Sequence, residues 1–134
     1  MANMSDYLEE KILKALFKNE FYASPTPYIA LLTAVPDDTS TGSTISEPST
    51  EDGYARQLAD STKWGDPDDG TIKNSADIKW EDVEWTATIV AVAICDAVED
   101  GNVLFWGELA STKQIAFGDS VTFRPDALSI EIDD

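Results

Sequence analysis

The strongest constraint on the fold is the stretch from Trp85 to Gly107, in which two apolar runs flank a short polar turn. The first run, Ile89 to Cys95, is the longest in the chain, and the second extends from Val103 to Trp106. The residues between them include Glu-Asp-Gly-Asn, a composition typical of tight turns. A continuous apolar run is typical of a strand that is covered on both faces. The stretch therefore predicts a β-hairpin whose first strand is buried on both sides.

One amphipathic helix is predicted near the N-terminus, over residues 5–18. Ser5 or Asp6 can cap its start, and Asn19 is a plausible stop. Its apolar residues recur at helical spacing and form one stripe, which is expected to pack at one end of the sheets or at a subunit interface. The stripe consists of Leu8, Ile12, Ala15 and Leu16.

Short strands separated by turn residues are predicted in the rest of the chain. Tyr28 to Val35 is nearly continuous in apolar residues and is expected at the centre of a sheet. Residues 115–117 and 121–123 flank a Gly-Asp-Ser turn and predict another hairpin, after a polar connection at 109–114. The remaining predicted strands are 53–58, 77–80, 83–85 and 128–132. The predicted fold is a single domain over 1–134 that is mainly β, an antiparallel β-sandwich or barrel of jelly-roll type with one N-terminal α-helix.

The charge balance excludes one large class of partners. The chain has 26 acidic and nine basic residues and a net charge of −17. Nucleic-acid binding needs clustered lysine and arginine, so no nucleic acid is expected as a partner. The acidity has two interpretations, adaptation to high salt or specific sites for cations or a basic partner. Adaptation to high salt, and hence a halophilic source, is favoured because the acids are scattered along the chain.

Several kinds of site are excluded by what the sequence lacks. It has no histidine, which removes Ser-His-Asp and Cys-His catalysis and His-ligated metals. The single cysteine, Cys95, lies in the longest apolar run and is expected to act as a small hydrophobe. No apolar run approaches the roughly 20 residues that span a bilayer, and the N-terminus is unlike a secretory signal. Neither membrane insertion nor a cofactor is expected.

The densest acidic cluster, Asp66, Asp68 and Asp69, is a weak candidate for a metal site. An EF-hand loop starting at Asp66 needs glycine at its sixth position, but Gly70 is the fifth residue, so the pattern fails. A calcium site of another type stays open. The favoured interpretation is a solvated turn.

Other carboxylates suggest an enzyme only under a strict condition. Glu81, Asp82 and Glu84 would act as general acid and base in a hydrolase if two of them converged in a cleft. No nucleophile motif or histidine accompanies them, so the protein is not expected to be an enzyme.

The four tryptophans supply a further hypothesis. Trp64, beside the acidic turn, is the best candidate for an exposed ring that stacks on a sugar, whereas the other three are expected in the core or a subunit interface. Those three are Trp80, Trp85 and Trp106. With the acidic turn, Trp64 defines the alternative function, a halophilic carbohydrate- or calcium-binding β-domain.

Taken in order, the motifs along most of the chain resemble a family of small virion proteins of tailed viruses, often labelled phage tail-fibre proteins. The segments that carry the resemblance are SDYLEEKIL at 5–13, PYIALLTAVP at 27–36, GYARQ at 53–57, NSADIKW at 74–80, AICDAVEDGNVLFWGEL at 93–109 and FGDSVTFRPDALSIEID at 117–133. The resemblance implies a non-enzymatic structural protein with no catalytic residues to transfer.

The same resemblance implies a location and partners. The protein would be made in the host cytoplasm and exposed on the virion as a capsid turret or decoration, or as a tail-fibre or baseplate component. Its partners would be further copies in a pentamer or trimer, other virion proteins, and the host surface. Relatives carry more Gly, Ala and Ser in the loops where this chain is acidic, which agrees with a halophilic host. The polar loop 39–51 is expected to be displayed outward, to wrap a neighbour, or only to connect.

Overall fold

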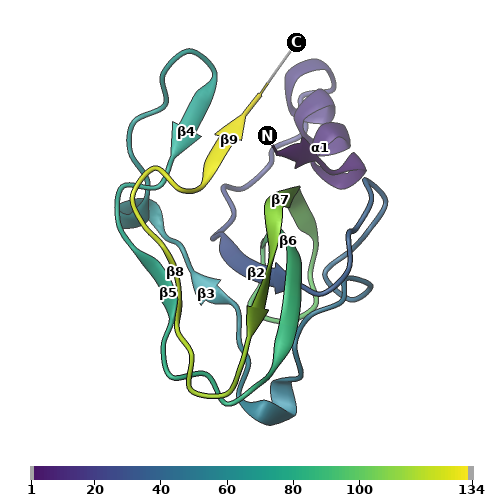
Figure 1. Cartoon of the computed structure of the whole chain (residues 1–134). Helices are drawn as coiled ribbons and strands as arrows, with labels where there is room; N and C mark the ends of the chain where they lie inside the picture. Colours follow the sequence, from purple (N-terminus) through teal and green to yellow (C-terminus); the bar gives the residue numbers. More distant parts are fainter. Residues whose placement is uncertain (1, 133–134) are drawn as a thin grey trace.

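A computed structural model describes residues 2–132, which form a mainly β fold with one α-helix near the N-terminus (Figure 1). All strand pairs are antiparallel, and they make one large and two small sheets. The large sheet has the order β1 (Asn3–Met4), β7 (Val103–Ile115), β6 (Ala87–Cys95), β2 (Tyr28–Leu32) and β3 (Gln57–Leu58). The small sheets pair β4 (Thr71–Lys73) with β9 (Ser129–Glu131), and β5 (Ile78–Trp80) with β8 (Val121–Phe123). The prediction of a mainly β, antiparallel fold with one N-terminal helix is confirmed, although the sheets do not close into a barrel.

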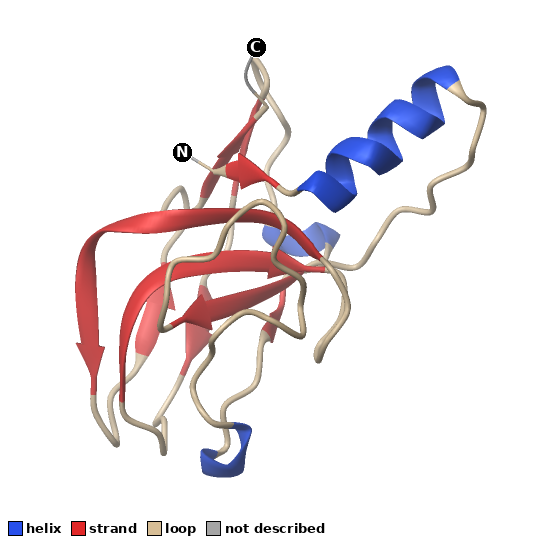
Figure 2. Ribbon diagram, turned by 90° about the vertical axis from the view of Figure 1, so that its right-hand side faces the viewer, coloured by secondary structure: helices blue, strands red, loops and turns tan. Residues whose placement is uncertain are grey.

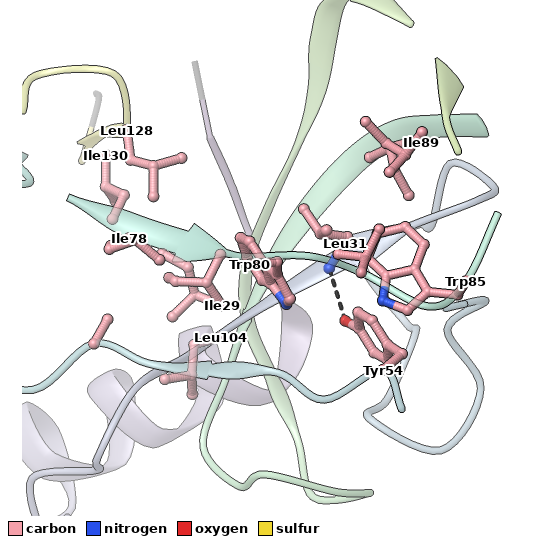
Figure 3. Close-up of a cluster of buried hydrophobic side chains, with 14 of the residues drawn as sticks. Ile29, Leu31, Tyr54, Ile78, Trp80, Trp85, Ile89, Leu104, Leu128 and Ile130 are labelled. Carbon is pink, nitrogen blue, oxygen red and sulfur yellow. Dashed lines mark hydrogen bonds between the residues drawn. The ribbon is translucent and has the colours of Figure 1, made fainter. Parts of the chain in front are cut away.

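The main core lies between the large sheet and the two small ones (Figures 1 and 3). Ile29 and Leu31 of β2 meet Trp80 of β5 and Ile130 of β9 in one buried cluster. Trp85 lies edge-on to Tyr54, with the ring centroids 5.7 Å apart. The small sheets therefore act as a second layer over one face of the large sheet, as in a sandwich.

Strand β6 is buried on both faces, as the sequence predicts. Ile89 and Ile94 belong to the main core, while Ala91, Ala93 and Cys95 belong to a second cluster on the other face. A register shift between Ile89 and Ala91 changes which residues point to which face. The second face is covered by a loop and not by another sheet: the partly buried Ile45, from the loop 39–51, packs on this cluster.

Strand β7 is longer than predicted. The polar segment 109–114 was expected to be a connection, and that prediction is wrong because these residues continue β7, where Gln114 pairs with Thr88 and Lys113 with Ile89. Most side chains in this half of β7 are exposed. Because most of its side chains face solvent, the segment does not alternate between apolar and polar residues, and the sequence alone gives no indication of a strand.

Other strand predictions also need correction. Residues 115–117 and 121–123 do not form a hairpin with each other, because β8 pairs with β5. Residues 83–85 are not a strand, although Val83 and Trp85 are buried. The predicted strands at 28–35, 53–58, 77–80 and 128–132 exist as the shorter β2, β3, β5 and β9. Two 3-10 turns, η1 (Thr50–Asp52) and η2 (Ser61–Lys63), flank β3.

Helix α1 (Asp6–Phe17) follows the sequence prediction closely. The Ser5 hydroxyl accepts a hydrogen bond from the Leu8 amide at 3.2 Å and so caps the helix. Asn19, just past the end, adopts a φ of 55°, a left-handed conformation that stops a helix. Two backbone bonds fix the start, from the Ser5 amide to the Leu104 carbonyl and from the Asp6 amide to the Asp38 carbonyl, both at 2.9 Å. The remainder of α1 projects away from the sheets (Figure 2).

Candidate functional site

The acidic cluster predicted as a weak metal candidate forms a tight hairpin turn. Asp68 and Thr71 exchange two backbone hydrogen bonds, of 2.8 and 3.0 Å, and Asp69 and Gly70 both have positive φ. This is the geometry of a two-residue turn that Asp-Gly favours. Across residues 2–132, no three acidic, cysteine or histidine side chains are gathered closely enough to hold a metal ion. The structure therefore does not bring Asp66, Asp68 and Asp69 together as a ligand set.

The carboxylates considered for hydrolysis are all exposed. Glu81 forms an ion pair with Lys79, with 2.9 Å between Oε1 and Nζ, and both side chains are about half exposed or more. Asp82 occupies a left-handed conformation, with φ of 46°, and its amide donates to the Ser120 hydroxyl. Glu81 and Asp82 line one open polar depression, and all three carboxylates line a second depression, also open to solvent, beside Trp80 and Trp85.

The tryptophans serve the core more than the surface. Trp64, the best candidate for an exposed sugar-stacking ring, is half-buried against the main core, and its indole N–H donates to the Ala59 carbonyl at 2.9 Å. Trp80 and Trp85 are buried, as predicted. Trp106 is half-buried, packs on the second cluster, and donates to Asp38 at 2.9 Å.

The main polar centre of the molecule was not predicted, and it is built around Arg56. All five N–H groups of its guanidinium are used. Two bonds go to Glu47, at 2.8 and 3.1 Å, and the others reach the backbone carbonyls of Gly42, Ala97 and Asp100 at 2.8 to 2.9 Å. Burial alone would lower the pKa of Arg56, but the hydrogen bonds and charge of Glu47 raise it above its ordinary value. Arg56 thus ties the loop 39–51 to the β6–β7 turn.

Tyr54 extends this centre into the core. Its hydroxyl donates to Glu47 at 2.7 Å and accepts from the Leu31 amide of β2 at 2.9 Å (Figure 3). Burial, and then the Glu47 carboxylate, raise the pKa of Tyr54 well above its ordinary value, so the hydroxyl remains a donor. The GYARQ segment at 53–57 therefore has a structural role. The sequence feature that could have indicated this role is Arg56, which is one of only two arginines in an acidic chain.

The loop 39–51 is held on the body of its own chain. The Gly42 amide donates to the Gly101 carbonyl at 3.0 Å, and a Cβ at Gly42 would lie 1.7 Å from the Asp100 carbonyl oxygen. Only glycine fits such an approach. The loop covers the second cluster through Ile45, so this placement favours neither outward display nor wrapping around a neighbour.

A second unpredicted polar residue, Asn74, holds the C-terminal segment. Its side chain is fully buried, donates to the carbonyls of Ala76, Phe123 and Arg124 at 2.9 to 3.2 Å, and accepts from the Leu128 amide at 2.9 Å. The amide thus joins β4 to the segment between β8 and β9. Asn74 begins the NSADIKW segment, so a second family motif also has a structural role.

The strongest candidate for a functional surface is the far end of α1. Of the predicted stripe, only Leu8 is buried, Ile12 is half-buried, and Ala15 and Leu16 are exposed. The far half of the stripe does not pack on the sheets, because the helix leaves the body after its first turns (Figure 2), and a subunit interface for it stays a prediction. We call the exposed group Leu13, Leu16, Phe17 and Phe21 the apolar tip; these side chains are 56%, 70%, 76% and 91% exposed.

Exposed apolar side chains in a cluster are typical of interaction surfaces. None of the helices in residues 2–132 has the length and apolar character needed to cross a membrane. The apolar tip is therefore the strongest candidate for a partner-binding surface among the described residues.

Comparison with known proteins identifies the family. No curated protein matches the sequence. A family model described as Podophage GP4 fiber I protein gp80 matches residues 3–131, which is nearly the whole chain and includes all the segments quoted above up to residue 131. The chain belongs to this family of podophage fibre proteins.

Proposed function

We propose that this protein is a non-enzymatic structural subunit of a tailed virus particle, exposed on the virion as part of a fibre. The observation that carries the proposal is the match to the fibre family over residues 3–131. The virion is then its location, and other virion proteins are its partners.

The placement of the polar residues supports a structural role. Arg56 and Asn74 use their side-chain hydrogen bonds to fasten loops and chain segments within the molecule. Satisfied buried polar networks make a structure rigid and specify a single arrangement. Such rigidity suits a building unit that is repeated on a particle.

The acidity supports the further proposal of a halophilic host. With a net charge of −17, the chain repels itself in dilute buffer, and concentrated salt screens this repulsion. The acidic Asp68-Asp69 turn and the exposed Glu81, Asp82 and Glu84 place part of this charge on the surface.

The experiment that tests the proposal is immunogold labelling of purified virus particles, with peptide mass spectrometry of the same preparation. We expect peptides of this protein in the particles and gold on a fibre. Antibody absorbed beforehand with the recombinant protein is the control. If the protein is abundant in infected cells and missing from purified particles, the proposal is overturned; gold confined to the capsid would overturn the fibre location.

A further inference from the structure

The apolar tip of α1 carries a charge opposite to that of the rest of the molecule. Residues 11–21, which include the tip, contain three lysines, Lys11, Lys14 and Lys18, and one acid, Glu20. The other 25 acids and the other six basic residues lie elsewhere in the chain. The tip is thus a small basic and apolar surface on a strongly acidic body. A partner that fits it is apolar at its centre and acidic at its rim.

The body of the same protein offers such a surface. A cavity of about 230 Å³ lies between β6 and β7 on one side and the segment that leads into β9 on the other. Its lining is mostly apolar, with Ile94, Phe105, Leu109, Leu128 and Ile130 among its residues. This volume is smaller than the roughly 300–1,000 Å³ of small-molecule sites, and it suits one or two inserted side chains.

Among the residues that line this cavity, one is charged, and it is acidic: Glu108 of β7. The cavity therefore complements the tip in its apolar character, and Glu108 offers a carboxylate to a lysine of the tip.

The tip does not reach the cavity of its own chain. The start of α1 is fixed by the backbone bonds of Ser5 and Asp6, and the helix then points away from the sheets (Figure 2). Twelve residues of helix extend about 18 Å, which carries the tip clear of the body. No residue of α1 lines the cavity. Tip and cavity are therefore separate surfaces, one of each on every copy.

We infer that the apolar tip of one copy inserts into the β7–β9 cavity of a second copy, so that copies associate head to tail. Phe17 and Leu16 enter the cavity, and Lys14 and Lys18 approach Glu108 at its edge. An interface between two different surfaces closes into a ring when the rotation between copies permits, which includes trimers and pentamers. The inference rests on the proposed role as a repeated virion subunit, because it explains how copies of the chain hold together.

The test uses two double variants of the full chain. The tip variant, Leu16→Asp with Phe17→Asp, changes residues that are 70% and 76% exposed, so the fold should be kept. The cavity variant, Ala110→Arg with Ser129→Arg, adds bulk and positive charge at two exposed lining residues. Phe117→Asp is the matched control, because Phe117 is 72% exposed and lies outside both surfaces. Circular dichroism checks that all variants fold, and sedimentation velocity in dilute and in molar KCl gives their masses.

We expect the unaltered protein and the Phe117→Asp control to form oligomers, and each double variant alone to sediment as a monomer of 14.6 kDa. An equal mixture of the two double variants should then give a dimer of twice that mass and nothing larger. The intact tip of the cavity variant fills the intact cavity of the tip variant. No third copy can add, because the remaining tip and the remaining cavity of the dimer both carry the substitutions.

Four results would overturn the inference. The first three are a monomeric unaltered protein in all salts, an oligomeric tip variant, and a mixture that stays monomeric. The fourth is a cavity variant that still forms oligomers, which would point to helix-to-helix pairing. A protein found in virus particles yet monomeric in solution would refute only the head-to-tail contact and leave the proposed function standing.

Discussion

Arg56 and Glu47 form a bidentate ion pair, with Nη2 2.8 Å from Oε1 and Nε 3.1 Å from Oε2. The Arg56 side chain is 2% exposed and that of Glu47 is 17% exposed. A fork of this kind needs the planar guanidinium, because a lysine ammonium cannot supply the same parallel donors. The pair joins the loop 39–51, the GYARQ segment and the β6–β7 turn in one place.

Replacing Arg56 should therefore destabilise the protein strongly. Arg56→Met leaves three backbone carbonyls without their donor and leaves the Glu47 carboxylate with only the Tyr54 hydroxyl. We expect a loss of about 3–5 kcal/mol in the free energy of unfolding. Urea denaturation measures it. Lys79→Met is the matched control, since it breaks the exposed Lys79–Glu81 pair and should leave the unfolding curve unchanged. Equal effects from the two substitutions would contradict the role given to Arg56.

Asn74→Asp should also be severe, although it changes hardly any volume. The substitution puts a carboxylate oxygen where the amide nitrogen donates to three carbonyls. We expect a loss of at least about 2 kcal/mol in stability, measured by chemical denaturation. Asn19→Asp, at an exposed left-handed position that Asp also tolerates, is the control and should be close to neutral. A mild effect at Asn74 would mean that the C-terminal segment is held by other contacts.

Ala91→Glu or Ala93→Glu should abolish folding. Both alanines are 0% exposed, in the second cluster beneath the loop 39–51, and a buried charge without a partner costs several kcal/mol. Thr88→Glu, at an exposed position of the same strand, is the control. Soluble expression and circular dichroism provide the measurement. Folded, soluble protein from either alanine variant would show that β6 is not covered on this face.

Stability should fall as the solution becomes alkaline. Burial raises the pKa of the Cys95 thiol from an ordinary 9.0 to about 12, and it also raises the pKa of Tyr22 from 10.0 to about 12. Above about pH 9 the unfolded chain therefore loses protons that the folded chain still holds, so the free energy of unfolding declines from there to about pH 12.

Cys95→Ala isolates the thiol contribution to that decline. One proton corresponds to at most about 1.4 kcal/mol per pH unit, so the variant should have a shallower slope above pH 9 by up to that amount. Val103→Ala, in the same cluster, is the control because it lowers stability without removing a titrating group. The slopes come from urea unfolding at a series of pH values. A parallel slope in Cys95→Ala would contradict the assignment.

The halophilic proposal predicts a specific response to salt. Because the net charge is −17, molar KCl should raise the melting temperature relative to dilute buffer. Calcium chloride at millimolar concentration, with and without EDTA, is the comparison. A large rise in the melting temperature from calcium alone would favour a specific cation site. Equal or greater stability in dilute buffer would contradict the halophilic proposal.

The amino-acid sequence by itself determined the local features of this protein. The capped helix ending before Asn19 and the β6–β7 hairpin with its doubly buried first strand all follow from neighbouring residues. Apolar periodicity and turn chemistry act over a few positions, so a single sequence carries them.

Only the tertiary structure decided which distant segments meet. β8 pairs with β5 and not with its neighbour in sequence, and Arg56 binds carbonyls 41 and 44 positions further along the chain. No local pattern encodes such convergence, because an arginine or asparagine looks the same in a sequence whether it is solvated or buried. The helix stripe shows the same limit: periodicity predicts an apolar face, but the direction in which α1 leaves the sheets decides that its far end stays uncovered.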